Sequence, residues 1–386
     1  MRSKLCLPDY NGKSLVNLMS SIGRAFGHKS KHKTLNDLKP CELCGYQNIV
    51  LLVIDGLGYE YLRKHGKGSI FSKYLKSPIT SVFPATTATC VTTFYTGLSP
   101  QEHAVTGWFV YLKEVDAVST ILRFEQRGSR TPLEKRISPK KIFDQKSFFS
   151  KIAANSYVVI SNKFVNSQYN ITSTTKAVKI GSNSYRDHLE NTKNIILSRS
   201  GRKFIYTYWP RFDELCHRYG VKSAAALTHF KKLDSHTNAF LEAIKHTNTR
   251  VIITADHGLV NTGKRRTVNI SRHPRLARIL EVPLCGDKRN VYCYVAPHNR
   301  TEFEKYVNTR LKKHCHLFKS RDLIKKGFFG PFKPHEKLRA RTGDYILAMK
   351  DNYAIKDCIN GEDDRYHNAD HGGLSRDEML VPLIVI

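Results

Sequence analysis

Carboxylate and imidazole side chains recur in this chain where apolar runs end, and such side chains can bind metal ions. Asp55 directly follows the continuous apolar run Ile49–Ile54. The full set comprises Asp55, Asp213, His217, Asp256, His257 and His371. Each residue alone has an ordinary explanation, since an aspartate after a strand commonly caps a helix. Together, three carboxylates and three imidazoles predict a pair of divalent metal ions, with zinc expected and manganese or iron as alternatives.

A hydroxyl-rich stretch between the first and second of these aspartates could supply a nucleophile. Residues 81–89 read S-V-F-P-A-T-T-A-T, with Thr86 and Thr87 adjacent, and lead into a segment that ends at Thr96-Gly97. Hydroxyls at the start of a helix lie beside unpaired backbone N–H groups and the positive end of the helix dipole, which favours an anion such as phosphate. A threonine beside a metal ion is a competent nucleophile at neutral pH. The alternative is a helix cap or a turn without catalytic function.

The elements that must position these residues alternate along the chain. Unbroken apolar runs, typical of strands buried on both faces, occur at 49–54, 157–160, 204–208, 251–254 and 291–295. Helical patterns lie between them, most clearly at Ser223–His246. This alternation predicts an α/β fold with a doubly wound, mostly parallel sheet and helices on both faces. Ligands then collect outside the carboxyl ends of the strands, where the candidate metal ligands lie.

The domain organisation predicted from the sequence is one catalytic unit with insertions. Residues 1–47 form an N-terminal extension with a helix over Ser14–Phe26, and residues 48–386 form the catalytic domain. The segments 113–150 and 262–365 are expected to be insertions, the latter containing cap or insert loops. His103 and His367 are expected to be surface or loop histidines.

Composition limits the classes of protein that the chain can represent. Its 386 residues are 40% hydrophobic and carry a formal charge of +30. This apolar content supports a core and excludes wholesale disorder, and no apolar run approaches the length of a membrane span. The charge has three explanations, which are a basic proteome, an anionic substrate, and nucleic acid or a membrane surface. No nucleic-acid-binding module is present, and nothing in the sequence specifies an oligomeric state.

The expected compartment is the cytoplasm. The basic N-terminus is not followed by the apolar stretch of a signal peptide. The nine cysteines are an odd number scattered along the chain, which does not suggest a disulfide framework.

The motifs occur in an order that resembles a known family. They are Val53-Ile54-Asp55-Gly56, the stretch Phe83–Thr87 followed by T-G-L-S-P-Q-E-H at 96–103, Asp213-x-x-x-His217, Asp256-His257-Gly258 and His371-Gly372-Gly373. This arrangement resembles the type I phosphodiesterase / nucleotide pyrophosphatase family of the alkaline phosphatase superfamily. The resemblance covers residues from 49 to the C-terminus, but residues 1–47 and much of 262–365 carry no matching motif.

The resemblance implies an alkaline-phosphatase-like fold, a ligand set and a mechanism. One metal ion would be held by Asp213, His217 and His371, and the other by Asp55, Asp256 and His257 together with the nucleophile. The register of the family motif places the nucleophile at Thr87, with Thr86 as the competitor. Thr87 would attack phosphorus in line to give a phosphothreonine, which water would then hydrolyse.

One departure from the family pattern concerns the substrate. Nucleotide pyrophosphatases carry an asparagine three residues after the nucleophile, where this chain has Cys90, and a thiol is a weak hydrogen-bond donor. The expected substrate is a small anionic phosphodiester, nucleotide-like or of the pyrophosphate type. The enzymatic alternative is a phosphomonoester or phosphonate on the same site, and the non-enzymatic one is a basic nucleic-acid-binding protein. Aromatic residues that could stack on a leaving group are Tyr59, Phe83, Trp108, Tyr208 and Trp209.

Overall fold

A seven-stranded sheet lies at the centre of the larger part of the molecule. The computed structural model describes residues 5–199, 201–362 and 364–386, so residues 1–4 of the predicted extension lie outside it. The strand order is β2-β18-β9-β1-β8-β6-β7, and the four pairs from β9 to β7 are parallel. The strands are β1 (Asn48–Ile54), β2 (Leu75–Thr80), β6 (Asn155–Ser161), β7 (Ala177–Ser182), β8 (Lys203–Trp209), β9 (Thr249–Thr254) and β18 (Leu380–Val385).

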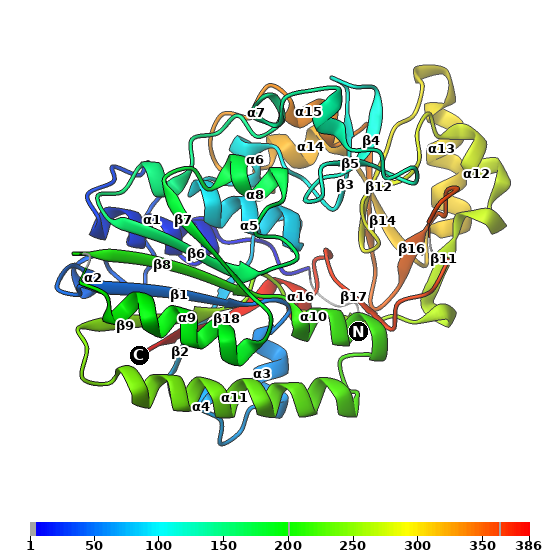
Figure 1. The fold of residues 1–386 in the computed structure, drawn as a ribbon. Helices are drawn as coiled ribbons and strands as arrows, with labels where there is room; N and C mark the ends of the chain where they lie inside the picture. The colour runs from blue at the N-terminus through cyan, green and yellow to red at the C-terminus, as the bar shows by residue number, and fades with distance from the viewer. Residues whose placement is uncertain (1–4, 200, 363) are drawn as a thin grey trace.

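Helices cover both faces of this sheet, which confirms the predicted fold class (Figure 1). One face carries α1 (Leu15–Ala25), α5 (Thr87–Thr96) and α8 (Gln168–Ser173). The other carries α3 (Tyr59–His65), α4 (Ile70–Lys73), α9 (Tyr185–Leu197), α10 (Arg211–Tyr219) and α11 (Ala224–Ile244). Because β1 and β8 are buried along their whole length, their sequences are mostly apolar or aromatic, apart from Asn48, Lys203 and Thr207.

The last strand runs against its neighbours and thereby brings a C-terminal motif to the same edge of the sheet. β18 pairs antiparallel with both β9 and β2. Its first residue therefore lies at the edge where the parallel strands end. The segment 371–379, which precedes β18 and includes α16 (Arg376–Met379), consequently lies beside the residues that follow β1 and β9.

A second, fully antiparallel sheet forms a cap. Its order is β14-β15-β13-β12-β3-β4-β5, so it combines strands from both predicted insertions. The strands are β3 (Phe109–Leu112), β4 (Ala117–Thr120), β5 (Glu125–Gln126), β12 (Cys285–Asp287), β13 (Asn290–Cys293), β14 (Cys315–Lys319) and β15 (Tyr345–Met349). Its main helices are α12 (Pro274–Ile279), α13 (Arg300–Tyr306), α14 (Ser320–Lys325) and α15 (Leu338–Arg341), as Figure 1 shows.

The apolar run at 291–295 belongs to this cap and not to the parallel sheet, so that part of the prediction is wrong. Along β13 and the two residues after it, Val291, Cys293 and Val295 pack into one apolar cluster. The alternate residues Tyr292 and Tyr294 pack into another. An antiparallel strand covered on both faces has the same unbroken apolar sequence as a buried parallel strand, so the pattern does not separate the two.

An apolar cluster joins the cap to the sheet-bearing part. Phe83 and Met379 lie on the sheet side of this cluster, and Tyr292 and Phe329 lie on the cap side. The ring of Phe83 meets that of Phe329 edge-on, with centroids 5.0 Å apart. The cap is therefore fixed over the carboxyl edge of the large sheet. Two small sheets lie at the periphery, in which β10 (Val260–Asn261) pairs with β17 (Ala369–Asp370) and β11 (Thr267–Asn269) with β16 (Ala354–Lys356).

The described part of the N-terminal segment packs into the core. The predicted helix forms as α1, and its residues Leu15, Val16 and Leu18 are fully buried in the cluster that also contains the sheet. His32, further along, lies 2.7 Å from Glu102 across buried surroundings. Glu102 belongs to α6 (Pro100–His103), so this contact ties the segment to the motif that follows α5.

His103 differs from its prediction as a surface or loop histidine. It is buried in α6, and its Nε2 lies 3.2 Å from the hydroxyl of Thr93. Burial lowers the pKa of His103 to about 3. The neutral ring is therefore a packing residue that links α6 to α5. Among the described residues, no helix is both long and apolar enough to cross a membrane.

Replacing Glu102 with glutamine should destabilise the protein in a pH-dependent way. Burial opposes the charge of Glu102, but hydrogen bonds from His32, Lys31 and Ser99 outweigh it and hold its pKa at about 2. The carboxylate therefore contributes stability above its ordinary pKa of 4.5, and that contribution is lost as the pH falls toward 2. We expect Glu102→Gln to cost about 2–3 kcal/mol at pH 7 in urea unfolding.

The control for this prediction is Glu242→Gln, because the Glu242 side chain is 65% exposed. The gap between Glu102→Gln and the wild type should narrow below about pH 4.5. A gap that stays constant down to about pH 3 would contradict this account of the ion pair.

Candidate metal centre and active site

All six residues predicted as metal ligands come together at the carboxyl edge of the large sheet, in two groups. Asp55, Asp256 and His257, here called the Asp55 group, follow β1 and β9. Asp213, His217 and His371, here called the Asp213 group, come from α10 and from the loop before α16. Within each group the candidate ligand atoms lie within 4.8 Å of one another. The groups adjoin, since the rings of His257 and His371 stack with centroids 3.8 Å apart.

The Asp55 group is organised by hydrogen bonds to backbone groups. Nε2 of His257 lies 3.4 Å from Asp55 Oδ1 and 3.5 Å from Asp256 Oδ2. Asp256 Oδ1 accepts from the N–H groups of Gly56 and His257 at 3.1 and 3.0 Å. The other ring nitrogen, Nδ1 of His257, donates to the carbonyl of Gly258 at 3.2 Å. That bond fixes the tautomer and leaves the Nε2 lone pair facing the carboxylates, as metal-binding histidines require.

The Asp213 group also places imidazole nitrogens beside a carboxylate, and two of its three residues lie on the helix α10. Asp213 and His217 are four residues apart in α10, so they share one face, and His217 Nε2 lies 3.1 Å from Asp213 Oδ2. His217 Nδ1 donates to the carbonyl of Ala369 at 2.7 Å. His371 Nε2 approaches Asp213 Oδ1 to 4.0 Å. Two histidines thus present nitrogen atoms to one carboxylate.

Close backbone approach explains two glycines of the motifs. Gly56 has φ of +75°, and a Cβ there would lie 2.6 Å from Leu259 Cδ1 and 3.1 Å from Asp213 Cβ. A Cβ on Gly258 would lie 2.0 Å from the carbonyl oxygen of Asp377. A side chain at either position would push the two groups apart. The glycines therefore permit the approach that the ligand residues need.

The charge balance of the site fits bound cations. Asp55, Asp213 and Asp256 are at most 7% exposed, and no described Lys or Arg forms an ion pair with any of them. The described residues offer no hydrogen-bond partner to Asp55 Oδ1, Asp213 Oδ1 or Asp256 Oδ2. Unpaired buried carboxylate oxygens are costly, whereas oxygen and nitrogen donors in this combination are those that zinc and related divalent ions bind. The donor set therefore fits two divalent metal ions.

The pKa values of the site residues show how strongly the carboxylates interact. Burial and the nearby carboxylates of Asp256 and Asp213 raise the pKa of Asp55 well above its usual value, although Tyr208 donates a hydrogen bond to it. Burial opposes the charge of Asp213, yet His217 and the other histidines hold its pKa below the usual value. Burial opposes the charge of His217 too, but Asp213 and Asp370 raise its pKa to about 9. In the metal-free site, His217 is therefore protonated at neutral pH.

The two candidate nucleophiles face different groups. Thr87 is the first residue of α5, and its Oγ1 lies 3.2 Å from His257 Nε2, within the Asp55 group. Thr86 is the residue before the helix, is 1% exposed, and faces Asp287 of the cap. The geometry therefore favours Thr87 over Thr86 as the hydroxyl beside a metal ion. Cys90 is fully buried, and its thiol contacts Ser81 Oγ and the carbonyl of Asp256, so it faces the core.

The sequence interpretation missed three polar residues beside the site. Asp287 comes from the β12–β13 turn, and its Oδ2 accepts from the N–H of Trp108 at 3.2 Å. Burial raises the pKa of Asp287 to about 6, against the opposing effects of Thr86 and of the Trp108 N–H. Asp370 and His367 form a third cluster with His217, in which His367 Nδ1 lies 2.9 Å from Asp370 Oδ1. Asp370 could have been found, because Asp370-His371-Gly372 repeats the pattern of Asp256-His257-Gly258.

Of the aromatic candidates, Trp108 lies closest to the cap residues of the site. Its backbone N–H donates to Asp287, and its side chain is half-buried. Phe83 is fully buried between the sheet and the cap, and Tyr208 is committed to Asp55. Trp209 lines a separate hollow of about 200 Å³ together with Tyr185.

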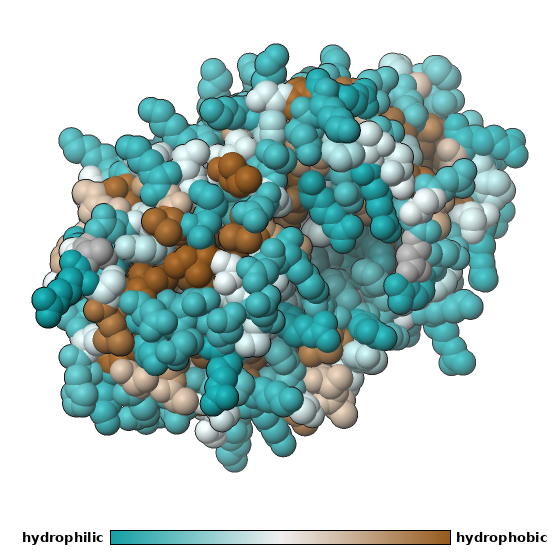
Figure 2. All heavy atoms as spheres, viewed as in Figure 1, coloured by the Kyte–Doolittle hydropathy of each residue, from teal (hydrophilic) through white to brown (hydrophobic). Residues whose placement is uncertain are grey.

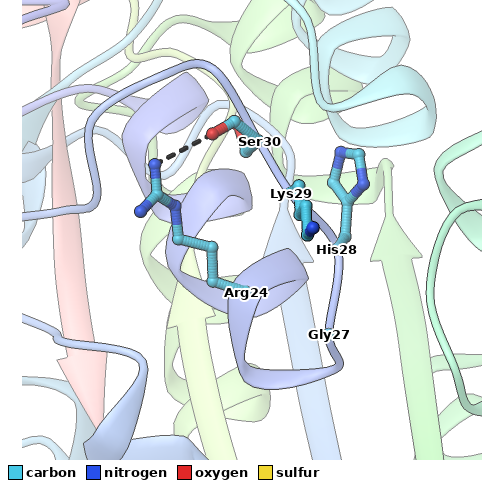
Figure 3. A pocket seen from close by; sticks show the side chains of 5 residues that line it. All are labelled: Arg24, Gly27, His28, Lys29 and Ser30. Carbon is cyan, nitrogen blue, oxygen red and sulfur yellow. Dashed lines mark hydrogen bonds between the residues drawn. The ribbon is translucent and has the colours of Figure 1, made fainter.

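The surface is hollowed in more than one place. Figure 2 shows a hollow bordered mainly by hydrophilic residues between the sheet-bearing part and the cap. A different hollow of about 420 Å³ is lined by Arg24, Gly27, His28, Lys29 and Ser30 (Figure 3). Within it, Arg24 donates to the carbonyl of Ser30 at 2.9 Å. It shares no residue with either metal group, so it does not belong to the candidate active site.

Comparison with known proteins gives one family and several related folds. The family model described as type I phosphodiesterase / nucleotide pyrophosphatase matches residues 49–374. No curated protein matches at the sequence level. Murine ectonucleotide pyrophosphatase / phosphodiesterase 5 has a similar structure, with a TM-score of 0.65, 15% identity and 87% of each chain covered. Phosphonoacetate hydrolase from Sinorhizobium meliloti 1021 is similar as well, with a TM-score of 0.64, 15% identity and coverage of 88% of this chain and 90% of that one. At these identities the two likenesses concern the fold.

We expect Asp256→Asn to lower the metal content from two divalent ions per chain to one. The substitution removes a charged ligand of the Asp55 group while leaving the Asp213 group intact. Elemental mass spectrometry of the dialysed protein measures its metal content and tests this expectation. The matched control is Asp377→Asn, because the Asp377 side chain is 43% exposed and pairs with Lys64 at the surface. Equal loss of metal from both variants would argue against the assignment.

Metal binding to the Asp213 group should release a proton. Because the pKa of His217 is about 9 in the metal-free site, the ring must lose a proton before its Nε2 can bind an ion. Metal affinity should therefore rise with pH up to about 9 and level off above it. Calorimetric titration of the metal-free protein, in buffers of different ionisation enthalpy, measures the proton count. An affinity that is independent of pH between 7 and 9 is the contrary result.

Proposed function

This chain belongs to the type I phosphodiesterase / nucleotide pyrophosphatase family and is a phosphoric ester hydrolase, and from that premise we propose its reaction and site. It hydrolyses phosphodiester bonds, including bonds of the nucleotide or pyrophosphate type, through a phosphothreonine on Thr87. Two divalent metal ions, proposed to be zinc, are held by the Asp55 group and the Asp213 group. The cap formed from residues 262–365 and the earlier insertion covers the site.

One observation carries this proposal. Thr87 Oγ1 lies 3.2 Å from His257 Nε2, at the first turn of α5 and beside buried carboxylates that lack counter-ions. Because His257 Nδ1 donates to a carbonyl, its Nε2 accepts a hydrogen bond from the Thr87 hydroxyl in this arrangement. With an ion bound, Nε2 would face the ion instead, and the hydroxyl would lie beside that ion. A threonine in such surroundings is oriented for attack.

Different groups have different roles in the proposed reaction. Bound divalent ions supply Lewis acidity and offset the charge of the attacking and leaving oxygens. Thr87 Oγ gives up its proton to solvent and forms a bond to phosphorus, while the bond from phosphorus to the leaving group breaks and its electron pair goes to the leaving oxygen. The N–H groups at the start of α5 stabilise the negative charge on the phosphoryl oxygens. Water then adds to phosphorus, and the Thr87 oxygen leaves with a proton.

The alternative reactions use the same residues. Phosphonoacetate hydrolase has a similar fold, and an inactive variant of murine ectonucleotide pyrophosphatase / phosphodiesterase 5 has been solved in complex with AMP. A phosphomonoester or phosphonate therefore stays the second candidate substrate class. Family membership sets aside a solely non-enzymatic, nucleic-acid-binding role. The cytoplasmic compartment stays a prediction.

We expect Thr87→Ala to abolish hydrolysis and Thr86→Ala to retain most of it. Loss of a nucleophile typically costs at least about 10³-fold in kcat. Thr86 is the matched control because it is adjacent, has the same side chain and makes no capping hydrogen bond at the start of α5. The assays are hydrolysis of bis-p-nitrophenyl phosphate and of p-nitrophenyl phosphate with zinc or manganese present.

The two esters separate the candidate substrates. Faster hydrolysis of the diester would support the proposed phosphodiesterase activity. Faster hydrolysis of the monoester would show instead that the same site belongs to a phosphomonoesterase. If Thr86→Ala is the inactive variant, the nucleophile assignment is reversed. Full activity in both variants would exclude a threonine nucleophile altogether.

A further inference from the structure

Two segments of the cap are strongly basic. Residues 264–278 and 305–316 together contain ten lysines and arginines and no aspartate or glutamate, although the whole chain has 33 acidic residues to 63 basic ones. All ten of these residues are exposed at the surface. They are Lys264, Arg265, Arg266, Arg272, Arg275, Arg278, Lys305, Arg310, Lys312 and Lys313. The excess of positive charge is therefore greater here than in the chain as a whole.

The two segments lie beside each other at one end of the cap. Nδ1 of His273, in the first segment, lies 2.9 Å from the hydroxyl of Tyr306, in the second. Arg275 Nε lies 2.5 Å from Glu302, which precedes the second segment. Figure 1 shows α12 and α13, which carry parts of these segments, next to each other at the end of the cap that points away from the large sheet.

Tyr353 connects the two segments at a second point. The guanidinium group of Arg266 lies over its ring, 4.9 Å from the centroid. The ring of His314 meets the same tyrosine edge-on, with centroids 4.7 Å apart. Burial, followed by the positive charges of Lys313 and Lys350, lowers the pKa of His314. We call the surface formed by the two segments and Tyr353 the cap patch.

Most cations of the cap patch have no carboxylate partner in the described part of the chain. Of the ten, Arg275 alone forms an ion pair there, with Glu302. The neighbouring carboxylate of Glu304 pairs instead with Lys319 at 3.3 Å and accepts from the hydroxyl of Tyr345 at 2.7 Å. Gathering so many like charges is unfavourable, and a polyanion that binds them relieves their repulsion and releases its own counter-ions.

The side chains of the cap patch suit the phosphate groups of a nucleic acid. Six of the ten cations are arginines, whose planar guanidinium groups bind phosphate oxygens at two points. Arg275 and Arg278 lie three residues apart in α12 and therefore share one face of the helix. Tyr306 and Tyr353 are half-buried aromatic residues among these cations, and unpaired bases stack on such rings.

A membrane surface fits the cap patch less well. Peripheral membrane proteins combine cations with apolar side chains that enter the lipid. The large hydrophobic residues exposed in the described part of the chain lie outside the cap patch, and they are Leu7, Ile171, Val178, Leu197, Tyr219 and Leu227. An anionic vesicle therefore serves as a comparison in the test.

We propose that the cap patch binds a single-stranded nucleic acid through its phosphate backbone. This interaction goes beyond the proposed function and does not depend on it, because no residue of the cap patch belongs to either metal group. Since phosphates and not base edges are bound, we expect little preference for sequence and a strong dependence on salt.

The test is a titration of a fluorescently labelled single strand of about 20 nucleotides with the metal-loaded Thr87→Ala protein, followed by anisotropy. Replacing Arg272, Arg278 and Arg310 together with glutamine should weaken binding about 10- to 100-fold at about 0.1 M salt. The slope of log affinity against log salt concentration should become shallower by about 2, because each phosphate contact of a single strand contributes about 0.7.

The matched control replaces Lys222, Lys231 and Lys232 with glutamine. It removes the same charge from exposed positions in and just before α11, and it should change the affinity less than about 3-fold. Thermal unfolding checks that both triple variants are folded. If the triple cap variant unfolds, single replacements of its arginines carry the test, each expected to weaken binding about 2- to 5-fold.

Three results would overturn the proposal. One is no detectable binding of the strand by the parent protein. Another is an equal loss of affinity in the two triple variants, which would attribute binding to the overall charge of +30. The third is a cap variant that binds the strand normally but no longer binds vesicles of phosphatidylserine and phosphatidylcholine, which would assign the cap patch to a membrane. None of these readouts uses turnover, so failure of the proposed function is a separate result.

Discussion

Three carboxylates buried in one place form the constraint around which the molecule is built. Asp55, Asp213 and Asp256 lie at the carboxyl edge of the sheet without a lysine or arginine counter-ion among the described residues. Burying them is unfavourable unless cations are bound, so the proposed metal ions would also stabilise the fold. The surrounding features serve this cluster. Glycines permit close approach, carbonyls orient the histidines, and Tyr208 donates to Asp55.

The cap is part of this arrangement because it is joined to the metal-binding loops. The buried Arg289–Glu378 pair connects the β12–β13 turn to the loop before β18, and the cluster around Phe83 and Phe329 closes the apolar side. The candidate nucleophile and the Asp55 group are built from the large sheet and α5, and the β12–β13 turn of the cap adjoins the loop that carries His371.

The clustering of the candidate metal ligands was predictable because strand ends and ligand chemistry coincide in the sequence. Asp55 follows β1, and Asp256-His257 follows β9. Because β1 and β9 are parallel neighbours, the residues after them lie side by side at the carboxyl edge of the sheet. Residues of the cap were not predictable in this way. β13 has the sequence of a buried parallel strand but lies in the antiparallel cap, and Asp287 reaches the site only through tertiary packing. His103 was misjudged because a polar side chain inside α6 is buried by contacts distant in sequence.

The central claim is that phosphoryl transfer passes through Thr87 beside two divalent metal ions. The most direct measurement mixes the metal-loaded protein with a diester substrate, quenches the reaction in acid within one turnover, and locates the phosphoryl group by mass spectrometry of peptides. The account predicts one phosphoryl group on the peptide that contains Thr87, assigned by fragmentation to Thr87 and absent from Thr87→Ala. Phosphorylation of Thr86, or steady turnover with no phosphorylated peptide at any quench time, would contradict it.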